Sequence, residues 1–311
     1  MKSDLLDRFD HPLFDRHEVS VDVLRLDKID PLISGNKWFK LQPLLIGRKV
    51  KRPILSFGGS YSNHLHALAR FGQRYEIPTI GVVRGERKYT PTLEDAERWG
   101  MQLHFLDRDN YRAMRDSNSV QRSNVIRELT ARFGRFDLIP EGGATGSALQ
   151  GCAKIWGLVP DDYRPDRVIV SVGTGTTLAG LVLGAPAGTR LEGVAAITDF
   201  NYLRPAIGAV LSGRRLNPDV SWTLLPGVDL GFARLNAELA ALWMAASQQN
   251  LELDPVYTLR MLHTLIRRLL KGEYKPGSRI MLVHTGGLQG LRGQQERLSR
   301  LASAHCGPIP L

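Results

Sequence analysis

The sequence predicts an α/β fold with open, twisted and mostly parallel sheets that carry helices on both faces. Short apolar runs that look extended alternate with stretches of helical spacing through most of the chain. Several of these runs end directly in glycines, as strands do where they turn into a helix. The length of 311 residues suggests two domains, since a domain commonly holds roughly 100–200 residues.

The expected elements of the first half of the chain form one unit of alternating strands and helices. The apolar run 53–57 ends in Gly58 and Gly59, and apolar residues then recur at helical spacing up to Tyr75. A polar connection at 108–124 follows the third strand. We expect strands at 53–57, 78–83, 102–106 and 136–140, and helices at 62–75, 93–99 and 125–133.

The second half continues the alternation. The buried run 168–170 leads into a glycine-rich turn, and an apolar stripe at helical spacing lies near the end of the chain, with charged residues off it. We expect strands at 166–171, 191–197 and 279–283, and helices at 178–183, 235–249 and 256–270.

Composition places the chain among ordinary globular proteins, with 43% hydrophobic and 23% charged residues. The formal charge is +10, which leaves open a second function class, a non-catalytic binder of anions or nucleic acid. The basic residues are spread along the whole chain, and no basic segment interleaved with aromatic residues accompanies them. Solvated surface charge is therefore the favoured interpretation, and no nucleic-acid partner is expected.

The cysteines do not indicate a secreted protein, and the apolar segments do not indicate an export signal or a membrane-spanning helix. Cys152 and Cys306 form no CxxC pair, and no zinc or disulfide pattern exists. His64 and His66 do not share a helix face, so no metal site is expected. The acidic residues of segment 1–16 do not resemble an export signal, and no apolar run approaches ~18 residues. We expect a soluble cytoplasmic protein.

The segment 34–41 contains the first candidate for chemistry. It reads as a glycine turn feeding a helix, which Ser34 or Asn36 caps. Lys37 then lies in the first helical turn, where the dipole disfavours a cation by roughly 0.3–1 kcal/mol. Lys37 either points into water, or has a depressed pKa and supplies a neutral amine for a Schiff base. Lys40, on the same face, is either an exposed lysine or a positive charge near a phosphate.

A second candidate is the glycine-threonine turn 173–177, between an expected strand and an expected helix. Backbone N–H groups and the helix N-terminus hold a phosphate in such turns. Leu178 stands where the dinucleotide fingerprint has a third glycine, and no lysine follows the second glycine as in a Walker loop. An ordinary turn that binds nothing is the alternative.

Polar residues also follow or begin other elements. Ser62 and Asn63 open a helix after Gly58 and Gly59, where they either cap the helix or hold a substrate carboxylate. Asp254 and Pro255 fit a helix start, as N-cap and first helical residue.

Tyr257 near that helix start is either a core aromatic or a site residue, and Thr285 follows a strand before two glycines. In an α/β sheet, ligands bind outside the carboxyl ends of the strands. Ser62, the turn 173–177 and Thr285 are all expected there, so their convergence is the strongest indication of a site.

Taken together, these segments resemble the pyridoxal-phosphate enzymes of the tryptophan synthase β-like class, fold type II. Within that class they resemble the D-cysteine desulfhydrase and 1-aminocyclopropane-1-carboxylate deaminase family. The order and spacing agree over nearly the whole chain. The segments that carry the resemblance are SGNKWFKL, GGSYSNHLHALA, GTGTTLAG, DPVYT and HTGG.

The resemblance implies pyridoxal 5'-phosphate as cofactor and a role for each matching residue. Lys37 forms the Schiff base and moves the Cα proton, and Asn63 bonds the phenolic oxygen of the cofactor. Ser62 binds the substrate carboxylate, and Tyr257 acts as acid or base. The implied residues are, for catalysis, Lys37, Tyr257 and Ser62; for the cofactor, Lys37, Lys40, Asn63, Gly173, Thr174, Gly175, Thr176, Thr177, Thr258 and Thr285; and for the substrate, Ser62, Asn63 and Tyr257.

Two departures from the family bear on the substrate. The deaminases carry glutamate where this chain has Thr258, which offers a neutral hydrogen bond and favours β-elimination over cyclopropane opening. Val228 follows Pro226 and Gly227 where family members carry a site tyrosine. The expected reaction is conversion of D-cysteine to pyruvate, sulfide and ammonia. The alternatives are 1-aminocyclopropane-1-carboxylate deamination or another lyase or racemase reaction on a small amino acid.

The resemblance also implies the architecture. A small domain at 50–152 is inserted in a large cofactor-binding domain made of 1–49 and 153–311, with the cofactor between them. The family is commonly dimeric, so a homodimer is expected.

Overall fold

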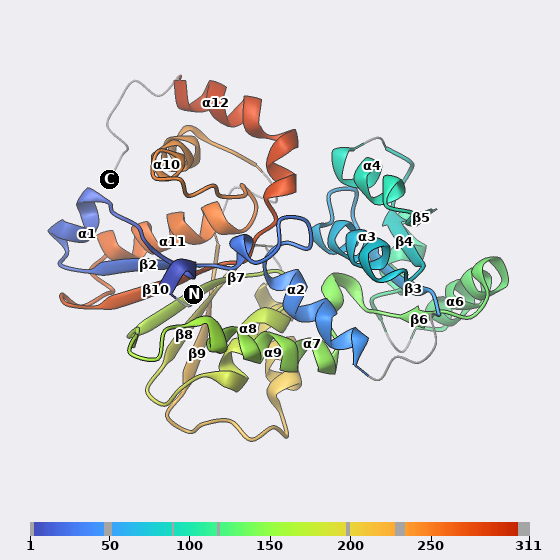
Figure 1. The fold of residues 1–311 in the computed structure, drawn as a ribbon, viewed down its shortest axis with the longest axis horizontal. Helices are drawn as coiled ribbons and strands as arrows, with labels where there is room; N and C mark the ends of the chain where they lie inside the picture. Colours follow the sequence, from blue (N-terminus) through green and yellow to red (C-terminus); the bar gives the residue numbers. More distant parts are fainter. Residues whose placement is uncertain are drawn as a thin grey trace.

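Two separate sheets divide the computed structural model into a large lobe and a small lobe (Figure 1). The structure describes residues 3–46, 52–88, 90–116, 119–196, 200–227 and 234–303. The strands of the small-lobe sheet lie between residues 54 and 138. Those of the large-lobe sheet lie on both sides of that range in the sequence, as an insertion produces. The boundaries at residues 50 and 153 stay a prediction.

The large lobe is built on a six-stranded sheet in the order β1-β2-β10-β7-β8-β9. Its pairs are parallel except β1 with β2. Alternate residues of the central strand β7 face opposite cores, Ile169 on one side and Val168 and Val170 on the other. The strands are β1 Leu6–Arg8, β2 Ser20–Arg25, β7 Arg167–Val172, β8 Arg190–Ala195, β9 Ser221–Leu225 and β10 Arg279–His284.

The small lobe contains a four-stranded parallel sheet in the order β5-β4-β3-β6. Its central strand β3 is buried along its whole length, because its neighbours cover both edges and helices cover its faces. The strands are β3 Ile54–Gly58, β4 Thr79–Arg84, β5 Gln102–Leu106 and β6 Asp137–Leu138.

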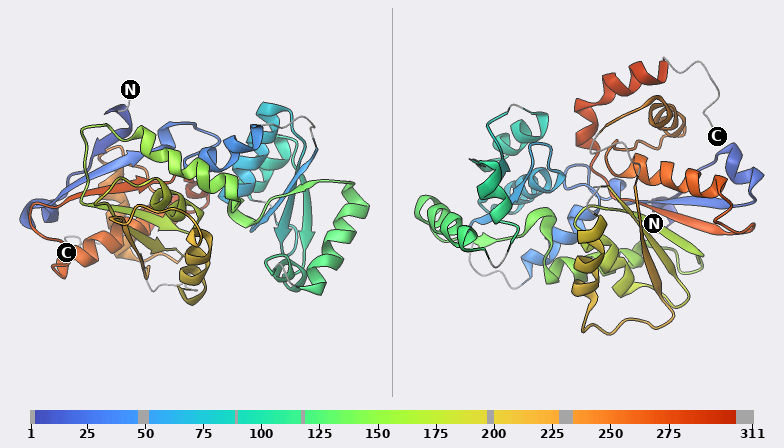
Figure 2. Two further views of the ribbon diagram at one scale, coloured as in Figure 1. Left: turned by 90° about the horizontal axis from the view of Figure 1, so that it is seen from below. Right: turned by 180° about the vertical axis from the view of Figure 1, so that it is seen from behind.

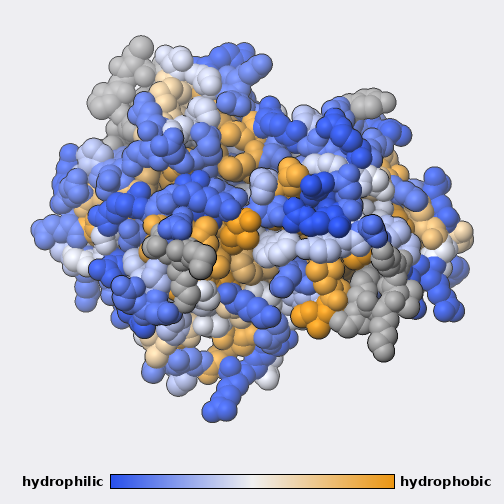
Figure 3. Space-filling view, in the orientation of Figure 1, coloured by the Kyte–Doolittle hydropathy of each residue, from blue (hydrophilic) through white to orange (hydrophobic). Residues whose placement is uncertain are grey.

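Helices cover both faces of the large sheet (Figure 2), which confirms the predicted fold class. Hydrophilic side chains predominate on the face drawn in Figure 3, with hydrophobic patches between them near its centre. None of the described helices is long and apolar enough to cross a membrane. The helices are α1 Pro12–Arg16, α2 Asn36–Leu41, α3 Asn63–Tyr75, α4 Pro91–Arg98, α5 Arg108–Ala113, α6 Val120–Phe133, α7 Gly146–Ala153, α8 Thr176–Gly184, α9 Phe200–Leu211, α10 Ala237–Ser247, α11 Thr258–Leu270 and α12 Gln295–Ser303.

Three local expectations are corrected. Helix α11 begins at Thr258, because the Asp254 carboxylate accepts the N–H groups of residues 256–258 and holds a separate turn ahead of the helix. The polar connection expected at 108–124 is mostly helical, because Asp107 caps α5 and Ser119 caps α6, which begins at Val120 instead of residue 125. The N-cap of α2 is Gly35, without a side-chain hydrogen bond, instead of Ser34 or Asn36.

Candidate active site

The helix that carries Lys37 is packed against the carboxyl end of β10. Gly35 has φ +65°, and a Cβ there would lie 2.0 Å from the carbonyl oxygen of Thr285. The Asn36 N–H donates to the same oxygen at 3.2 Å. Residue 35 must therefore be glycine for the start of α2 to meet the end of the sheet.

The amine of Lys37 is connected to the turn 173–177 through one side chain. Lys37 Nζ donates to Asn36 Oδ1 at 2.7 Å, and Asn36 Nδ2 donates to Thr177 Oγ1 at 2.8 Å. The sequence indicated Asn36 only as a helix cap, since nothing local shows that its amide reaches a residue far along the chain. The amine thus lies two hydrogen bonds from the glycine-threonine turn.

Burial, followed by the charge of Lys40, lowers the pKa of Lys37 to about 7. The opposing effects of Cys152 and Asp254 are smaller. Near neutral pH a large fraction of Lys37 is therefore the uncharged amine, which is the nucleophilic form.

This depressed pKa predicts a pH dependence of stability in the cofactor-free protein. An unfolded lysine keeps its proton up to its ordinary pKa of 10.5, whereas folded Lys37 loses it near 7. The unfolded state then binds more protons between these values, so the free energy of unfolding should rise with pH across that window. Urea unfolding at pH 7, 8 and 9 measures this rise.

The substitution Lys37→Met should flatten that rise, because it removes the group that titrates differently in the two states. Lys271→Met is the control, since this lysine is exposed at the end of α11. A wild-type protein without the rise, or a Lys37→Met variant that keeps it, would contradict the assignment.

Lys40 connects the same helix to the segment that leads from the small lobe back to the large lobe. Its buried Nζ donates to the Gly142 carbonyl oxygen at 2.9 Å, and burial lowers its pKa. A Cβ on Gly142, which has φ +68°, would lie 2.6 Å from Cγ2 of Thr174. The segment around Gly142 therefore contacts Lys40 as well as Thr174, and it links Lys40 to the turn 173–177.

The turn 173–177 joins β7 to α8, as the sequence predicts. Gly175 is the N-cap of α8 with φ +84° and makes no side-chain cap, so the first N–H groups of the helix remain available to an anion. The hydroxyl oxygens of Thr174 and Thr176 lie 3.3 Å apart. The turn therefore has amide and hydroxyl donors of the kind that suit a phosphate.

Tyr257 lies over this turn. A Cβ on Gly173 would be 3.3 Å from Cε1 of Tyr257 and 3.6 Å from its hydroxyl oxygen. Burial, and then the negative charges of Asp254 and Glu141, raise the pKa of Tyr257 to about 12. The phenol is therefore protonated near neutral pH and is suited to donating a proton.

Thr258 is fully buried behind Tyr257, and its hydroxyl bonds within its own turn. Its Oγ1 donates to the Asp254 carboxylate at 2.8 Å and accepts the Asp254 N–H at 2.8 Å. In this structure the Thr258 hydroxyl orders the turn before α11.

The start of α3 contributes the substrate-facing candidates. Ser62 Oγ caps the helix by accepting the Leu65 N–H at 3.2 Å. Asn63 Oδ1 accepts from Gln289 Nε2 at 2.7 Å, and a Cβ on Gly287 would be 2.4 Å from Asn63 Nδ2.

The structure thus brings the predicted site residues to one place, where the two lobes meet at the carboxyl ends of β3, β7 and β10. Thr285 belongs to the same place, with its hydroxyl 3.2 Å from that of Ser171. Val228 lies outside the described residues.

His64 is a residue of this site that the sequence did not assign to it. Ser56 Oγ donates to the Ile139 carbonyl oxygen and lies 2.9 Å from His64 Nε2, which must therefore donate to it. His64 Nδ1 has no hydrogen-bond partner among the described residues. Burial and the charges of Lys37 and Lys40 hold the pKa of His64 well below its ordinary value. His64 is a neutral, buried acceptor beside the lysine pair.

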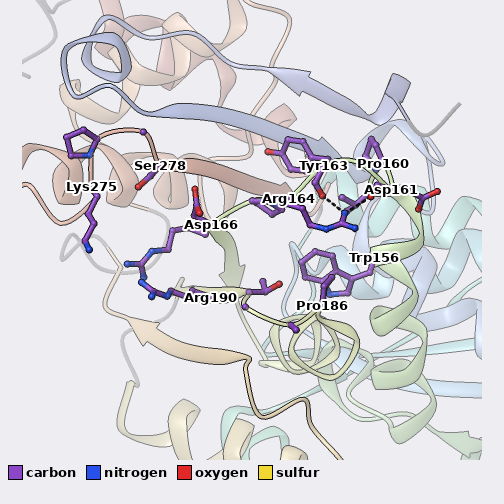
Figure 4. A pocket seen from close by; sticks show the side chains of 18 residues that line it. Trp156, Pro160, Asp161, Tyr163, Arg164, Asp166, Pro186, Arg190, Lys275 and Ser278 are labelled. Atoms are coloured by element: carbon purple, nitrogen blue, oxygen red, sulfur yellow. Dashed lines mark hydrogen bonds between the residues drawn. The ribbon is translucent and has the colours of Figure 1, made fainter.

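A cavity of about 790 Å³ lies at the opposite, amino end of β7, β8 and β10 (Figure 4). Arg190, Lys275 and Asp166 line it. Arg167 binds Glu192, and Arg164 donates to the carbonyl oxygens of residues 161 and 163. Among the described residues no cluster of three His, Cys, Asp or Glu side chains is arranged to hold a metal ion.

Known proteins resemble this chain over most of its length, although no family model matches it. It is 25% identical over 294 residues to the mitochondrial bifunctional D-cysteine desulfhydrase/1-aminocyclopropane-1-carboxylate deaminase of Arabidopsis thaliana, covering 86% of this chain and 72% of the relative. A putative 1-aminocyclopropane-1-carboxylate deaminase of Thermotoga maritima is 26% identical, covering 92% and 94%. The solved structure of a homologue of that deaminase superposes with a TM-score of 0.73 at 23% identity, covering 95% and 93%, which supports the fold.

Proposed function

Since this chain belongs to the pyridoxal-phosphate-dependent family of D-cysteine desulfhydrases and 1-aminocyclopropane-1-carboxylate deaminases, we propose that it catalyses β-elimination from D-cysteine. One water is consumed, and pyruvate, sulfide and ammonia are released. The observation that carries the proposal is the Lys37 amine, whose pKa is about 7 and which lies two hydrogen bonds from the glycine-threonine turn.

The residues present fit pyridoxal phosphate. A largely uncharged amine suits its aldehyde, and Lys40 with the N-terminus of α8 suits its phosphate. Asn63 would bond the phenolic oxygen and Thr285 would lie toward the ring, whereas the Thr258 hydroxyl already donates its proton to Asp254. When bound, the cofactor supplies an electron sink for the charge that develops at the substrate Cα.

The side chains around the substrate bind it and move its protons. The Ser62 hydroxyl and the N-terminus of α3 bind the substrate carboxylate, next to the cap that Ser62 already makes. Lys37 accepts the Cα proton, for which an amine of pKa about 7 is matched to neutral pH. Tyr257, protonated at that pH, donates a proton to the departing sulfur.

The family membership makes the protein an enzyme and sets aside the non-catalytic binder of anions or nucleic acid. Within the family, Thr258 supports β-elimination. Its uncharged hydroxyl stands where the deaminases carry glutamate. Without a carboxylate at that position the pyridine nitrogen of the cofactor is less readily protonated, and an unprotonated ring is a weaker electron sink. Cyclopropane opening, or another lyase or racemase reaction, is the alternative.

The test is a product assay across substrates. Purified protein with pyridoxal phosphate should release pyruvate, sulfide and ammonia in equal amounts from D-cysteine, with at least tenfold higher kcat/KM than from L-cysteine or the D- and L-serines. Ammonia from 1-aminocyclopropane-1-carboxylate with no sulfide from D-cysteine would replace this proposal by the deaminase. Inversion of amino acids without elimination would replace it by a racemase.

Ser62→Ala is expected to raise KM for the substrate about tenfold or more. A hydrogen bond to a charged carboxylate contributes about 1.5–3 kcal/mol. The lost cap should also cost about 1 kcal/mol of stability. Ser119→Ala is the matched control, because Ser119 caps α6 by accepting the Arg122 N–H and lies in no candidate site. The control should lose similar stability with unchanged KM, and an unchanged KM in Ser62→Ala would remove the carboxylate role.

The proposal includes the assembly expected for the family. The protein is a cytoplasmic homodimer that acts on a small amino acid, without nucleic-acid or membrane partners. Residues 50–152 form the inserted domain, and the cofactor lies between the domains. Light scattering of the purified protein tests the dimer.

A further inference from the structure

A short 3₁₀ helix, Leu288–Gly293, follows Thr285 of the candidate site in the sequence and contacts the small lobe. We call residues 287–293 the bridging segment. It packs against α4 of the small lobe, and two side chains attach it there. Gln289 Nε2 donates to Asn63 Oδ1 at 2.7 Å, and Arg292 Nη2 donates to Asp95 Oδ2 at 2.5 Å.

The Gln289 contact determines which end of the Asn63 amide is available to a ligand. A primary amide has one acceptor end and one donor end. The acceptor, Oδ1, is bonded to Gln289. The donor, Nδ2, lies against Gly287, where no side chain fits because a Cβ would be 2.4 Å away. Among the described residues, the donor end of the Asn63 amide is thus the end left without a hydrogen bond.

The second attachment keeps the bridging segment on the small lobe. The Asp95 side chain is mostly buried, and His66 Nε2 lies 3.2 Å from the same carboxylate oxygen that Arg292 binds. Arg98 approaches the other oxygen at 3.4 Å. A mostly buried carboxylate shared by several donors fixes the position of the arginine, and with it the backbone that carries Gln289.

We propose that Gln289 is a positioning residue that orients the Asn63 amide, so that its NH₂ group meets the phenolic oxygen of the cofactor only while the bridging segment lies on the small lobe. This rests on the proposed function, which assigns Asn63 to that oxygen. A negatively charged oxygen needs a donor there, and a reversed amide would present a carbonyl to it.

The decisive variant is Gln289→Glu, which keeps the length of the side chain and replaces its donor by acceptors. The glutamate should accept from Asn63 Nδ2 and turn the carbonyl of Asn63 toward the site. We expect about tenfold weaker binding of pyridoxal phosphate to the cofactor-free protein, measured by fluorescence titration. We also expect a shifted absorption maximum of the bound cofactor. Gln295→Glu is the control. Gln295 is exposed, and its substitution adds the same charge two residues beyond the bridging segment.

A double-mutant cycle separates orientation from packing. In an Asn63→Ala background, Gln289→Glu should cause no further loss of cofactor affinity, because the amide that it reverses is gone. In the cofactor-free protein, the melting-temperature changes of the two substitutions should also be non-additive. Additive effects in either measurement would overturn the inference.

The result for the wild-type protein distinguishes the two proposals. If it binds the cofactor, and Gln289→Glu changes neither affinity nor spectrum, the role of Gln289 is wrong and the proposed function stands. If the wild-type protein binds no pyridoxal phosphate, both are wrong, even where the melting temperatures still show that Asn63 and Gln289 interact.

Discussion

Lys37→Ala is expected to abolish turnover and to leave the fold intact. The loss of the proton acceptor alone should lower kcat by roughly 10²–10⁴-fold, and the loss of the amine that binds the aldehyde adds to it. The fold should survive because Lys37 is disfavoured as a cation in its half-buried position. Pyruvate release measures the activity, and circular dichroism with a melting curve measures the fold.

The covalent role of Lys37 has its own test. Borohydride reduction of the wild-type protein with pyridoxal phosphate should attach the cofactor to the peptide that contains Lys37, as peptide mapping detects. Lys28→Ala is the control, since Lys28 pairs with Asp7 at the surface. Label on another lysine, or full activity of Lys37→Ala, would refute the assignment.

Tyr257→Phe is expected to lower kcat by roughly 10²–10⁴-fold while the protein keeps its cofactor. The substitution removes a hydroxyl and preserves the ring that lies over Gly173. Because the pKa of Tyr257 is raised to about 12, the phenol stays protonated up to pH 9. The wild-type rate should therefore show no alkaline loss from this group in that range.

Steady-state kinetics and the cofactor absorption spectrum check this expectation. Tyr163→Phe is the matched control, because its hydroxyl donates to Asp22 away from the site. An equal loss in both variants would indicate a general effect of removing a buried hydroxyl. Unchanged kcat in Tyr257→Phe would assign the proton transfer to another group.

The sequence predicted the elements whose signals are local. The strand at 102–106 is found at those residues, because a short apolar run bounded by turn residues suffices to define it. The start of α11 was wrong by two residues, since the Asp254 carboxylate holds a turn that helix-capping patterns do not distinguish from a helix. The strand expected at 136–140 is found as the two residues Asp137–Leu138 of β6, because only these two pair with β3 and no local pattern shows where the pairing stops.

In the candidate site, too, the sequence predicted what local patterns show and missed the contacts between distant residues. Lys37 and the turn 173–177 were found because glycines next to strand ends and a lysine in a first helical turn are visible in sequence. The hydrogen bonds that orient these residues could not be predicted, because each joins two residues far apart in the chain. Asn36 meets Thr177 across 141 positions, and Gln289 meets Asn63 across 226. Which of these distant residues meet depends on the strand order of the parallel sheets, which brings the ends of particular strands together.

The close packing of Gly35 on the Thr285 carbonyl has a consequence for motion. It holds the start of α2, which carries Lys37, at the end of the large sheet, whereas Ser62 caps α3 of the small lobe. If Ser62 binds the substrate carboxylate as proposed, a rotation of one lobe relative to the other would change the distance between that carboxylate and the Lys37 amine. Under the proposed roles, proton abstraction would require both contacts at once, and an amino acid held by only one of them would leave unreacted.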